Sequence, residues 1–309
     1  MSTSASANRD NLSAEHVLRV SRPHLVVPEQ VLATASRSLD DPETPRTRDA
    51  SFPWSMALAN MLMSQELGEA LERAADWRGA RVLDAGCGPG VVTQAIAGFG
   101  VSEVVGVDKL PSMLEAATAF GVGGGNLSLR QADLTRLPFP SASFDIVACG
   151  DVPLVDAIRT ELWRVLRPGG MLVYKRTGIV AGCTFVWDPQ LETRYRAAVA
   201  RGMDTAGPPW SSRKPGWHLE ELIAEAEGPP AAFTTVVAQA SAPLPELWRT
   251  YIGQRFAAFE GPFLRAGASA EDWATISALL DPSASGSLYE RNDAYLAESV
   301  SVISLRASV

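Results

Sequence analysis

The chain has little of what several classes of protein require. Its 309 residues include three cysteines and three histidines, too few and too scattered for a disulfide framework or a zinc site. We therefore expect reduced, structural thiols and no bound metal. No uninterrupted apolar run reaches the roughly 20 residues of a membrane-spanning helix, and the polar residues 1–8 lack the charged-then-apolar order of a signal peptide. We expect a soluble, cytoplasmic protein with no membrane partner.

Dense runs of lysine and arginine are also missing. The chain has 27 basic and 35 acidic residues and a net charge of −8, whereas contacts to phosphates need clustered cations. A nucleic-acid partner is therefore not expected. The hydrophobic content of 46% is enough for a full core, and the length fits one large domain or a domain with a substantial cap.

The most informative stretch is a short apolar run that stops in a glycine-rich turn. In residues 81–90, Arg-Val-Leu-Asp-Ala-Gly-Cys-Gly-Pro-Gly, Val82 and Leu83 suit a buried strand. Three glycines follow at alternate positions, Gly86, Gly88 and Gly90, and allow the backbone to approach a ligand closely. Residues 91–97 are apolar at helical spacing, so we expect free N–H groups at a helix start to face a polar part of the ligand.

The spacing of the glycines separates two cofactor classes. A dinucleotide fingerprint has the form G-x-G-x-x-G, but Val91 stands where its third glycine belongs, and Asp84 precedes the first glycine by two positions. This D-x-G-x-G-x-G form resembles the first motif of class I S-adenosylmethionine-dependent methyltransferases. A nicotinamide oxidoreductase is the less favoured alternative.

Further strands in the expected order strengthen the resemblance. Residues 104–108 end in an acid suited to hold two ribose hydroxyls, and residues 127–134, 144–149 and 164–174 supply the next three strands. Residues 137–147 and the Arg-Pro-Gly-Gly turn at 167–170 resemble the subgroup with the ubiquinone and menaquinone methyltransferases and many natural-product enzymes. The resemblance covers about residues 80 to 176 and is identified on five ordered matches.

The resemblance implies S-adenosyl-L-methionine as cofactor and assigns contacts by position. Asp84 and the glycine turn would face its methionine part, Asp108 its ribose, and residues 132–134 its adenine, with residues 149–150 beneath the sulfonium. The full set of expected cofactor-binding residues is Asp84, Gly86, Cys87, Gly88, Gly90, Asp108, Lys109, Met113, Ala132, Asp133, Leu134, Cys149 and Gly150.

The alternation of strands and helical stretches predicts an α/β fold. With residues 233–239 and 295–305 as the last two strands, we expect a Rossmann-like, seven-stranded, mostly parallel sheet with helices on both faces. We expect a flexible extension and linker at 1–50 and the methyltransferase domain at 51–309. Its parts are a lid helix at 51–77, a cofactor-binding half at 80–176, the remaining core at 177–243 and 294–309, and a helical insertion at 244–293.

Catalytic groups are harder to predict, because methyl transfer mainly needs alignment and exclusion of water. Asp151 and His218 are the candidates for a polar or basic role toward the acceptor, and Lys175 and Arg176 are candidates for holding an acidic substrate group. The leading hypothesis is methyl transfer to O, N or C of a small, largely apolar metabolite in natural-product biosynthesis. The alternatives are a non-methylating cyclisation or rearrangement on the same cofactor, and a binding module. The insertion is expected to be either a substrate cap or the contact of a homodimer.

Overall fold

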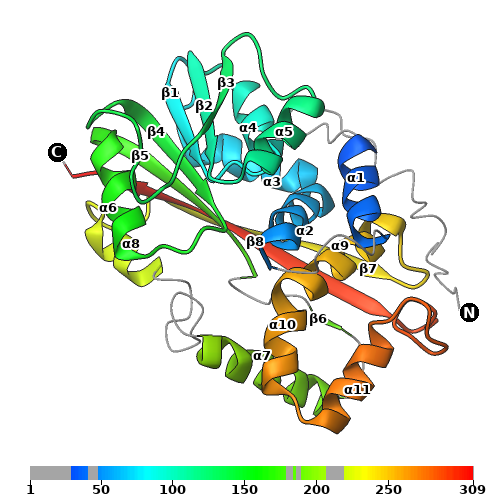
Figure 1. Cartoon of the computed structure of the whole chain (residues 1–309). Coiled ribbons are helices and arrows are strands. Elements are labelled where there is room, and N and C mark those ends of the chain that lie inside the picture. The colour runs from blue at the N-terminus through cyan, green and yellow to red at the C-terminus, as the bar shows by residue number, and fades with distance from the viewer. Residues whose placement is uncertain (1–28, 41–47, 179–183, 186–188, 207–218, 309) are drawn as a thin grey trace, which may run out of the picture.

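The computed structural model describes residues 29–40, 48–178, 184–185, 189–206 and 219–308. Its centre is an eight-stranded sheet in the order β3-β2-β1-β4-β5-β8-β6, with β7 along the other edge of β8 (Figure 1). The strands are β1 (Arg81–Ala85), β2 (Glu103–Asp108), β3 (Leu127–Gln131), β4 (Phe144–Gly150), β5 (Leu166–Thr177), β6 (Thr184–Phe185), β7 (Ala232–Ser241) and β8 (Tyr295–Arg306).

The predicted Rossmann-like α/β fold is confirmed. Strands β1 to β5 pair in parallel, and β8 runs antiparallel to both β5 and β7. All seven predicted strands are present. The additional strand, β6, has two residues, which is too short to give an alternating pattern in the sequence.

Helices cover both faces of the sheet, because successive strand residues point to opposite faces. Val82 packs in one apolar cluster with α3 (Ser64–Ala74), α4 (Val91–Ala97) and α5 (Pro111–Ala119), whereas Leu83 packs in another with α6 (Asp156–Val165) and α8 (Leu219–Glu225). Strands buried on both faces explain the near-continuous apolar runs that the sequence shows at β1, β2 and β4.

The N-terminal helices differ from the prediction. The single helix expected over residues 51–77 is two helices, α2 (Arg48–Leu62) and α3, separated at Met63. A further helix, α1 (Glu29–Asp40), lies in the segment expected to be a flexible extension. Ala35 of α1 is fully buried, and its carbonyl accepts a hydrogen bond from Gln254 Nε2 at 2.7 Å. The helix therefore depends on a partner more than 200 residues away, which no local pattern reveals.

The insertion between β7 and β8 is helical, as expected, but is more broken than predicted. It contains α9 (Glu246–Arg255), a π-helical turn η3 (Phe256–Glu260), α10 (Gly261–Gly267) and α11 (Ala270–Leu279). With α7 (Pro189–Ala206) these helices form what we call the cap, and Figure 1 shows α7, α10 and α11 gathered away from β1–β4. The cap shares an apolar core with α2, to which Trp54, Leu58 and Tyr251 contribute.

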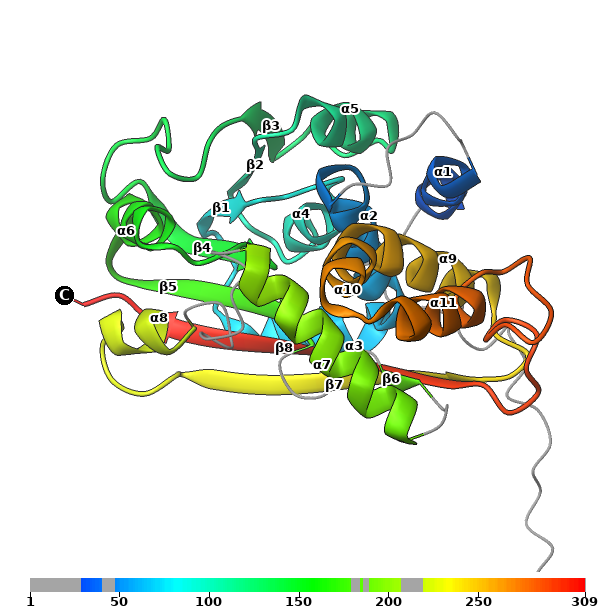
Figure 2. The ribbon, with the colours of Figure 1, turned by 60° about the horizontal axis from the view of Figure 1, so that its bottom comes forward.

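Two glycines allow α7 and α10 to pack in backbone contact, along the crossing visible in Figure 2. A Cβ at Gly202 would lie 1.7 Å from the Phe263 carbonyl oxygen, and one at Gly267 would lie 1.7 Å from that of Ala198. These distances are too short for any real Cβ, so larger residues at either position would push the helices apart.

We expect Gly202→Ala to lower the free energy of unfolding by about 1–3 kcal/mol, because overpacking outweighs the gain in helix propensity. Urea denaturation of the whole chain measures this. Thr193→Ala, an exposed change on the same helix, is the control and should alter stability by no more than about 0.5 kcal/mol. Equal stability of Gly202→Ala and wild type would contradict the packing.

Candidate functional site

A cavity of about 560 Å³ opens at the carboxyl ends of β1, β2 and β4, the place where open α/β sheets bind ligands. Most of the predicted cofactor residues line it: Asp84, Gly86, Cys87, Gly88, Asp108, Lys109, Asp133, Leu134, Cys149 and Gly150. Gly90, Met113 and Ala132 do not. Met113 is buried among apolar residues shared with the cap, and Ala132 is buried beside Leu134.

The glycine turn fits a ligand-binding role. Gly86, Gly88 and Gly90 have φ of +82°, +53° and +82°, a region that other residues rarely adopt. A Cβ at Gly86 would lie 2.6 Å from Val152 Cγ2, and one at Gly90 would lie 2.8 Å from Val122 Cγ1. A Cβ at Gly88 would meet no atom within 4 Å. Because Gly88 also lines the cavity, its missing side chain leaves room for a ligand there.

The N–H groups of the turn itself bond within the protein. Those of Gly86 and Cys87 donate to the Val107 carbonyl, and that of Gly90 donates to the Cys87 carbonyl. Gly88 N donates to Asp108 Oδ2 at 2.9 Å. These four N–H groups therefore hold the turn in shape and to the end of β2, and the expectation of free N–H groups at the start of α4 stays a prediction. The turn contributes to the shape of the cavity, because Gly88 leaves open space in its lining.

Asp108 is fixed at the end of β2 by two backbone groups. Its Oδ2 accepts from Gly88 N, and its Oδ1 accepts from Leu110 N, each at 2.9 Å. Each carboxylate oxygen has more than one acceptor direction, so the group can also accept from hydroxyls in the cavity that it lines. This arrangement suits the predicted contact to a ribose.

Asp84 is buried at the base of the cavity. The pKa of its carboxyl is raised to about 6, mainly because burial disfavours the charged form. The hydrogen bond from Thr93 Oγ1, at 2.6 Å, acts in the other direction and lowers the pKa. The charge of Asp108 raises the pKa, and the charge of Lys175 lowers it. A buried carboxylate with a raised pKa is a ready partner for a cationic ligand group.

The remaining predicted residues differ in exposure. Asp133 is exposed, and the N–H and hydroxyl of Thr135 hold the pKa of its carboxyl below the usual range. Cys87 and Cys149 are free, buried thiols. Burial raises the pKa of both well above that of an ordinary thiol. These two cysteines are therefore un-ionised, in agreement with the expected structural role.

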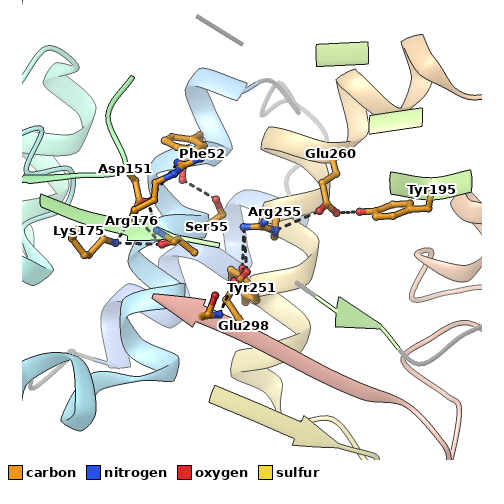
Figure 3. Close-up of polar contacts among 12 residues, drawn as sticks. Phe52, Ser55, Asp151, Lys175, Arg176, Tyr195, Tyr251, Arg255, Glu260 and Glu298 are labelled. Carbon is orange, nitrogen blue, oxygen red and sulfur yellow. Dashed lines mark hydrogen bonds and ion pairs between the residues drawn. The ribbon is translucent and has the colours of Figure 1, made fainter. Parts of the chain in front are cut away.

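Asp151 and Lys175 form a buried ion pair at the far side of the cavity, shown in Figure 3. Asp151 also accepts from Thr177 N at 2.7 Å and Thr177 Oγ1 at 3.0 Å, and Lys175 Nζ donates to Asn60 Oδ1 at 2.6 Å. Burial raises the pKa of Asp151, but Lys175, Arg176 and these hydrogen bonds outweigh it, so the pKa lies below its usual value.

A carboxylate held in this way is a weak base. The catalytic role predicted for Asp151 stays a prediction, and the geometry favours an electrostatic role over proton removal. The other candidate, His218, lies outside the described residues. Lys175, predicted as a candidate for holding an acidic substrate group, lies opposite Gly150 in the β4–β5 pairing and lines the cavity.

A second buried polar cluster lies in the cap and was not predicted. Arg255 contacts Tyr251, Glu260 and Glu298, while Tyr195 donates to Glu260 and Tyr251 donates to Glu298 (Figure 3). These residues join α7, α9, η3 and β8. The residues of this cluster are separated by up to about a hundred positions in the chain, so no local sequence pattern predicts their contacts.

Known proteins resemble the chain over this site. Residues 83–174 match the family described as a methyltransferase domain. The chain is 32% identical over 184 residues to the O-methyltransferase resE of Aspergillus sclerotiorum, covering 57% of this chain and 64% of the relative. It is 46% identical over 77 residues to the demethylmenaquinone methyltransferase of Deinococcus radiodurans, covering 23% and 32%. The YcgJ protein of Bacillus subtilis gives a TM-score of 0.49 at 19% identity, covering 79% of this chain and 99% of that structure.

The chain spans less than two thirds of the length of these curated relatives. The matched residues 83–174 nevertheless contain the glycine turn, Asp84, Asp108 and every other residue predicted to bind the cofactor. Residues 83–174 are therefore similar to a methyltransferase domain, in agreement with the resemblance of the same stretch to class I S-adenosylmethionine-dependent methyltransferases.

Proposed function

We propose that the protein transfers a methyl group from S-adenosylmethionine to an O, N or C atom of a small, largely apolar metabolite in specialised biosynthesis. The observation that carries the proposal is one cavity that joins the cofactor residues to an apolar wall. The O-methyltransferase among the relatives supports oxygen as one of the three acceptor atoms.

The apolar wall supports the proposed acceptor class. Its side chains come from α2 and from the loop after β4: Phe52, Pro53, Met56, Ala57, Val152 and Pro153. The volume of about 560 Å³ lies in the range of small-molecule sites. Because the cofactor occupies part of that space, the remainder suits a compact acceptor.

The chemistry asks little of individual side chains. When bound, S-adenosylmethionine supplies an electrophilic methyl group on a sulfonium, and the positive charge is neutralised during transfer. By the family resemblance, Asp84 would hold the methionine end, Asp108 the ribose and Ala132–Leu134 the adenine. The apolar wall excludes water. The buried Asp151–Lys175 ion pair holds one carboxylate and one ammonium in fixed positions beside the acceptor space.

Calorimetric titration of S-adenosylmethionine into wild type and Asp108→Ala tests the cofactor assignment. We expect the variant to lose about 10- to 100-fold in affinity, because a hydrogen bond to a charged group contributes about 1.5–3 kcal/mol. The change also leaves two backbone N–H groups without their carboxylate. Asp76→Ala, which removes an exposed acid outside the cavity, is the matched control and should bind normally.

Failure of cofactor-free wild type to bind S-adenosylmethionine would overturn the proposal. If binding is confirmed, mass spectrometry of products from a panel of small aromatic and polyketide-like acceptors counts the methyl groups added. A mass gain of one methyl group with release of S-adenosylhomocysteine supports transfer, whereas an isomerised product without that gain would support the non-methylating alternative.

A further inference from the structure

The edge strand of the sheet, β7, has an unpaired side and exposed hydrophobic residues, as protein–protein interfaces do. In the part of the chain that the structure describes, β7 pairs with β8 alone. Figure 2 shows it running along the rim of the sheet beside β8. Phe233 and Val237, both on this strand, are the large hydrophobic side chains that are exposed among the described residues, at 55% and 59%.

Natural sheets usually protect such an edge, and β7 lacks two of the usual protections, a short strand and charged side chains. Edge strands are typically short, or carry charged residues or proline that prevent pairing with another chain. β7 has ten residues, and no charged residue occurs between Ala231 and Pro243. An unprotected edge of this length is a template for a further strand.

The backbone groups that face outward can be identified from the pairing with β8. Ala242 N donates to the Ala294 carbonyl at 2.8 Å, and hydrogen-bonded positions alternate along an antiparallel pair. The even-numbered residues of β7 therefore bond to β8, whereas the odd-numbered residues direct N–H and C=O groups outward. Even-numbered side chains such as Val236 and Ala238 pack on the core shared with α3.

We propose that β7 pairs antiparallel with β7 of a second copy of this chain, giving a homodimer with one continuous sheet. A two-fold axis beside Thr235 places Phe233 of each copy opposite Val237 of the other and Thr235 opposite Thr235. All three are outward-bonding, odd-numbered positions. The pairing therefore satisfies the free backbone groups and sets each exposed hydrophobic side chain beside one of the partner strand on the same face of the sheet.

Symmetry favours a second copy over another partner, and the uncharged strip allows it. Each copy has a net charge of −8, so two copies repel over most of their surfaces, whereas the β7 strip is uncharged. A two-fold interface uses the same patch on both partners, and the four-residue spacing of Phe233 and Val237 is complementary to itself in this register. A strand interface is modest in area, so we expect dimerisation to depend on concentration.

Sedimentation equilibrium of the whole chain, from submicromolar to high micromolar concentrations, tests the proposal. We expect a dimer that Val237→Lys converts to a monomer. Ser128→Lys, which adds the same charge to the strand at the opposite edge of the sheet, should still dimerise. A monomeric wild type at every concentration, or equal dimerisation of Val237→Lys, would overturn the proposal.

Cysteine crosslinking tests the register independently of any loss of folding. In the proposed pairing the two Thr235 Cα atoms lie about 5.5 Å apart, within the range that a disulfide bridges. Oxidised Thr235→Cys should therefore run as a covalent dimer on a non-reducing gel. Gln239→Cys should not, because its copies lie about 26 Å apart along the strands. Crosslinking of Gln239→Cys but not Thr235→Cys would exclude this register.

Discussion

Asp84→Asn is expected to stabilise the cofactor-free protein at neutral pH while weakening its affinity for S-adenosylmethionine. The carboxyl is buried, and burial raises its pKa from 3.8 to about 6. An ionised group in this environment destabilises the fold. Asparagine removes the charge, keeps the shape and retains an oxygen that can accept from Thr93 Oγ1.

The sign of the effect follows from proton linkage. Between pH 3.8 and about 6, the folded protein binds a proton at Asp84 that the unfolded chain has released. Stability from this group is therefore fully present below pH 3.8 and is lost as pH rises through about 6. Each unit of pKa corresponds to about 1.4 kcal/mol, so the loss is about 3 kcal/mol in wild type. The variant does not lose it.

Urea denaturation of both proteins without cofactor measures this difference. We expect Asp84→Asn to be more stable by up to about 3 kcal/mol at pH 8, and the difference to disappear toward pH 4. Ser128→Ala, a change at an exposed residue outside the cavity, is the control and should show no comparable dependence on pH. A constant difference between pH 4 and pH 8 would contradict the assigned pKa.

Cofactor binding should change in the opposite direction. If Asp84 meets the ammonium of the methionine part, ionised Asp84 is the binding form, and wild-type affinity should fall as pH drops below about 6. Asp84→Asn should bind weakly at all of these pH values. Calorimetric titration of S-adenosylmethionine at pH 5 and pH 8 measures the affinity of both proteins. A wild-type affinity that is the same at the two pH values would contradict a charged contact at Asp84.

Local sequence features were sufficient to predict the cofactor half of the fold. Near-continuous apolar runs define β1, β2 and β4, and the positive φ at Gly86, Gly88 and Gly90 explains why glycine stands there. Asp108 is the last residue of its strand, as predicted. These features depend on neighbouring residues, so the sequence pattern contains them.

The features that sequence reasoning missed depend on distant partners. The helix α1 is buried against α9, and the cluster around Arg255 draws residues from four elements. The pKa of Asp151 is also set by residues elsewhere, on β5. From the sequence Asp151 looks like a possible base, but Lys175 and Thr177 occupy its oxygens once β4 and β5 pair.

Lys175→Met is expected to destabilise the protein by about 3–5 kcal/mol, because it breaks a buried ion pair and leaves one charge behind. The side chains of Lys175 and Asp151 are 4% and 3% exposed. Methionine replaces the aliphatic part of lysine, so little packing is lost. Asp151 retains the donors of Thr177 and the more distant Arg176, 3.8 Å away.

The pH dependence should have the sign opposite to that of Asp84. Lys175 helps to hold the pKa of Asp151 below its usual value, so this pair stabilises the fold above the unfolded pKa and the contribution is lost as pH falls through the folded pKa. The cost of Lys175→Met should therefore be largest near neutral pH and shrink in acid. The ammonium also lowers the pKa of Asp84, so its removal should raise the pH below which cofactor affinity falls.

A double-mutant cycle isolates the pair from the packing. Asp151→Asn combined with Lys175→Met removes both charges, and replacing both members of a buried pair costs much less than removing one. We therefore expect the double variant to be more stable than Lys175→Met alone at neutral pH. If the double variant is instead less stable than Lys175→Met by the full cost of the single Asp151→Asn change, the two residues contribute to stability independently. That result would contradict a stabilising ion pair between them.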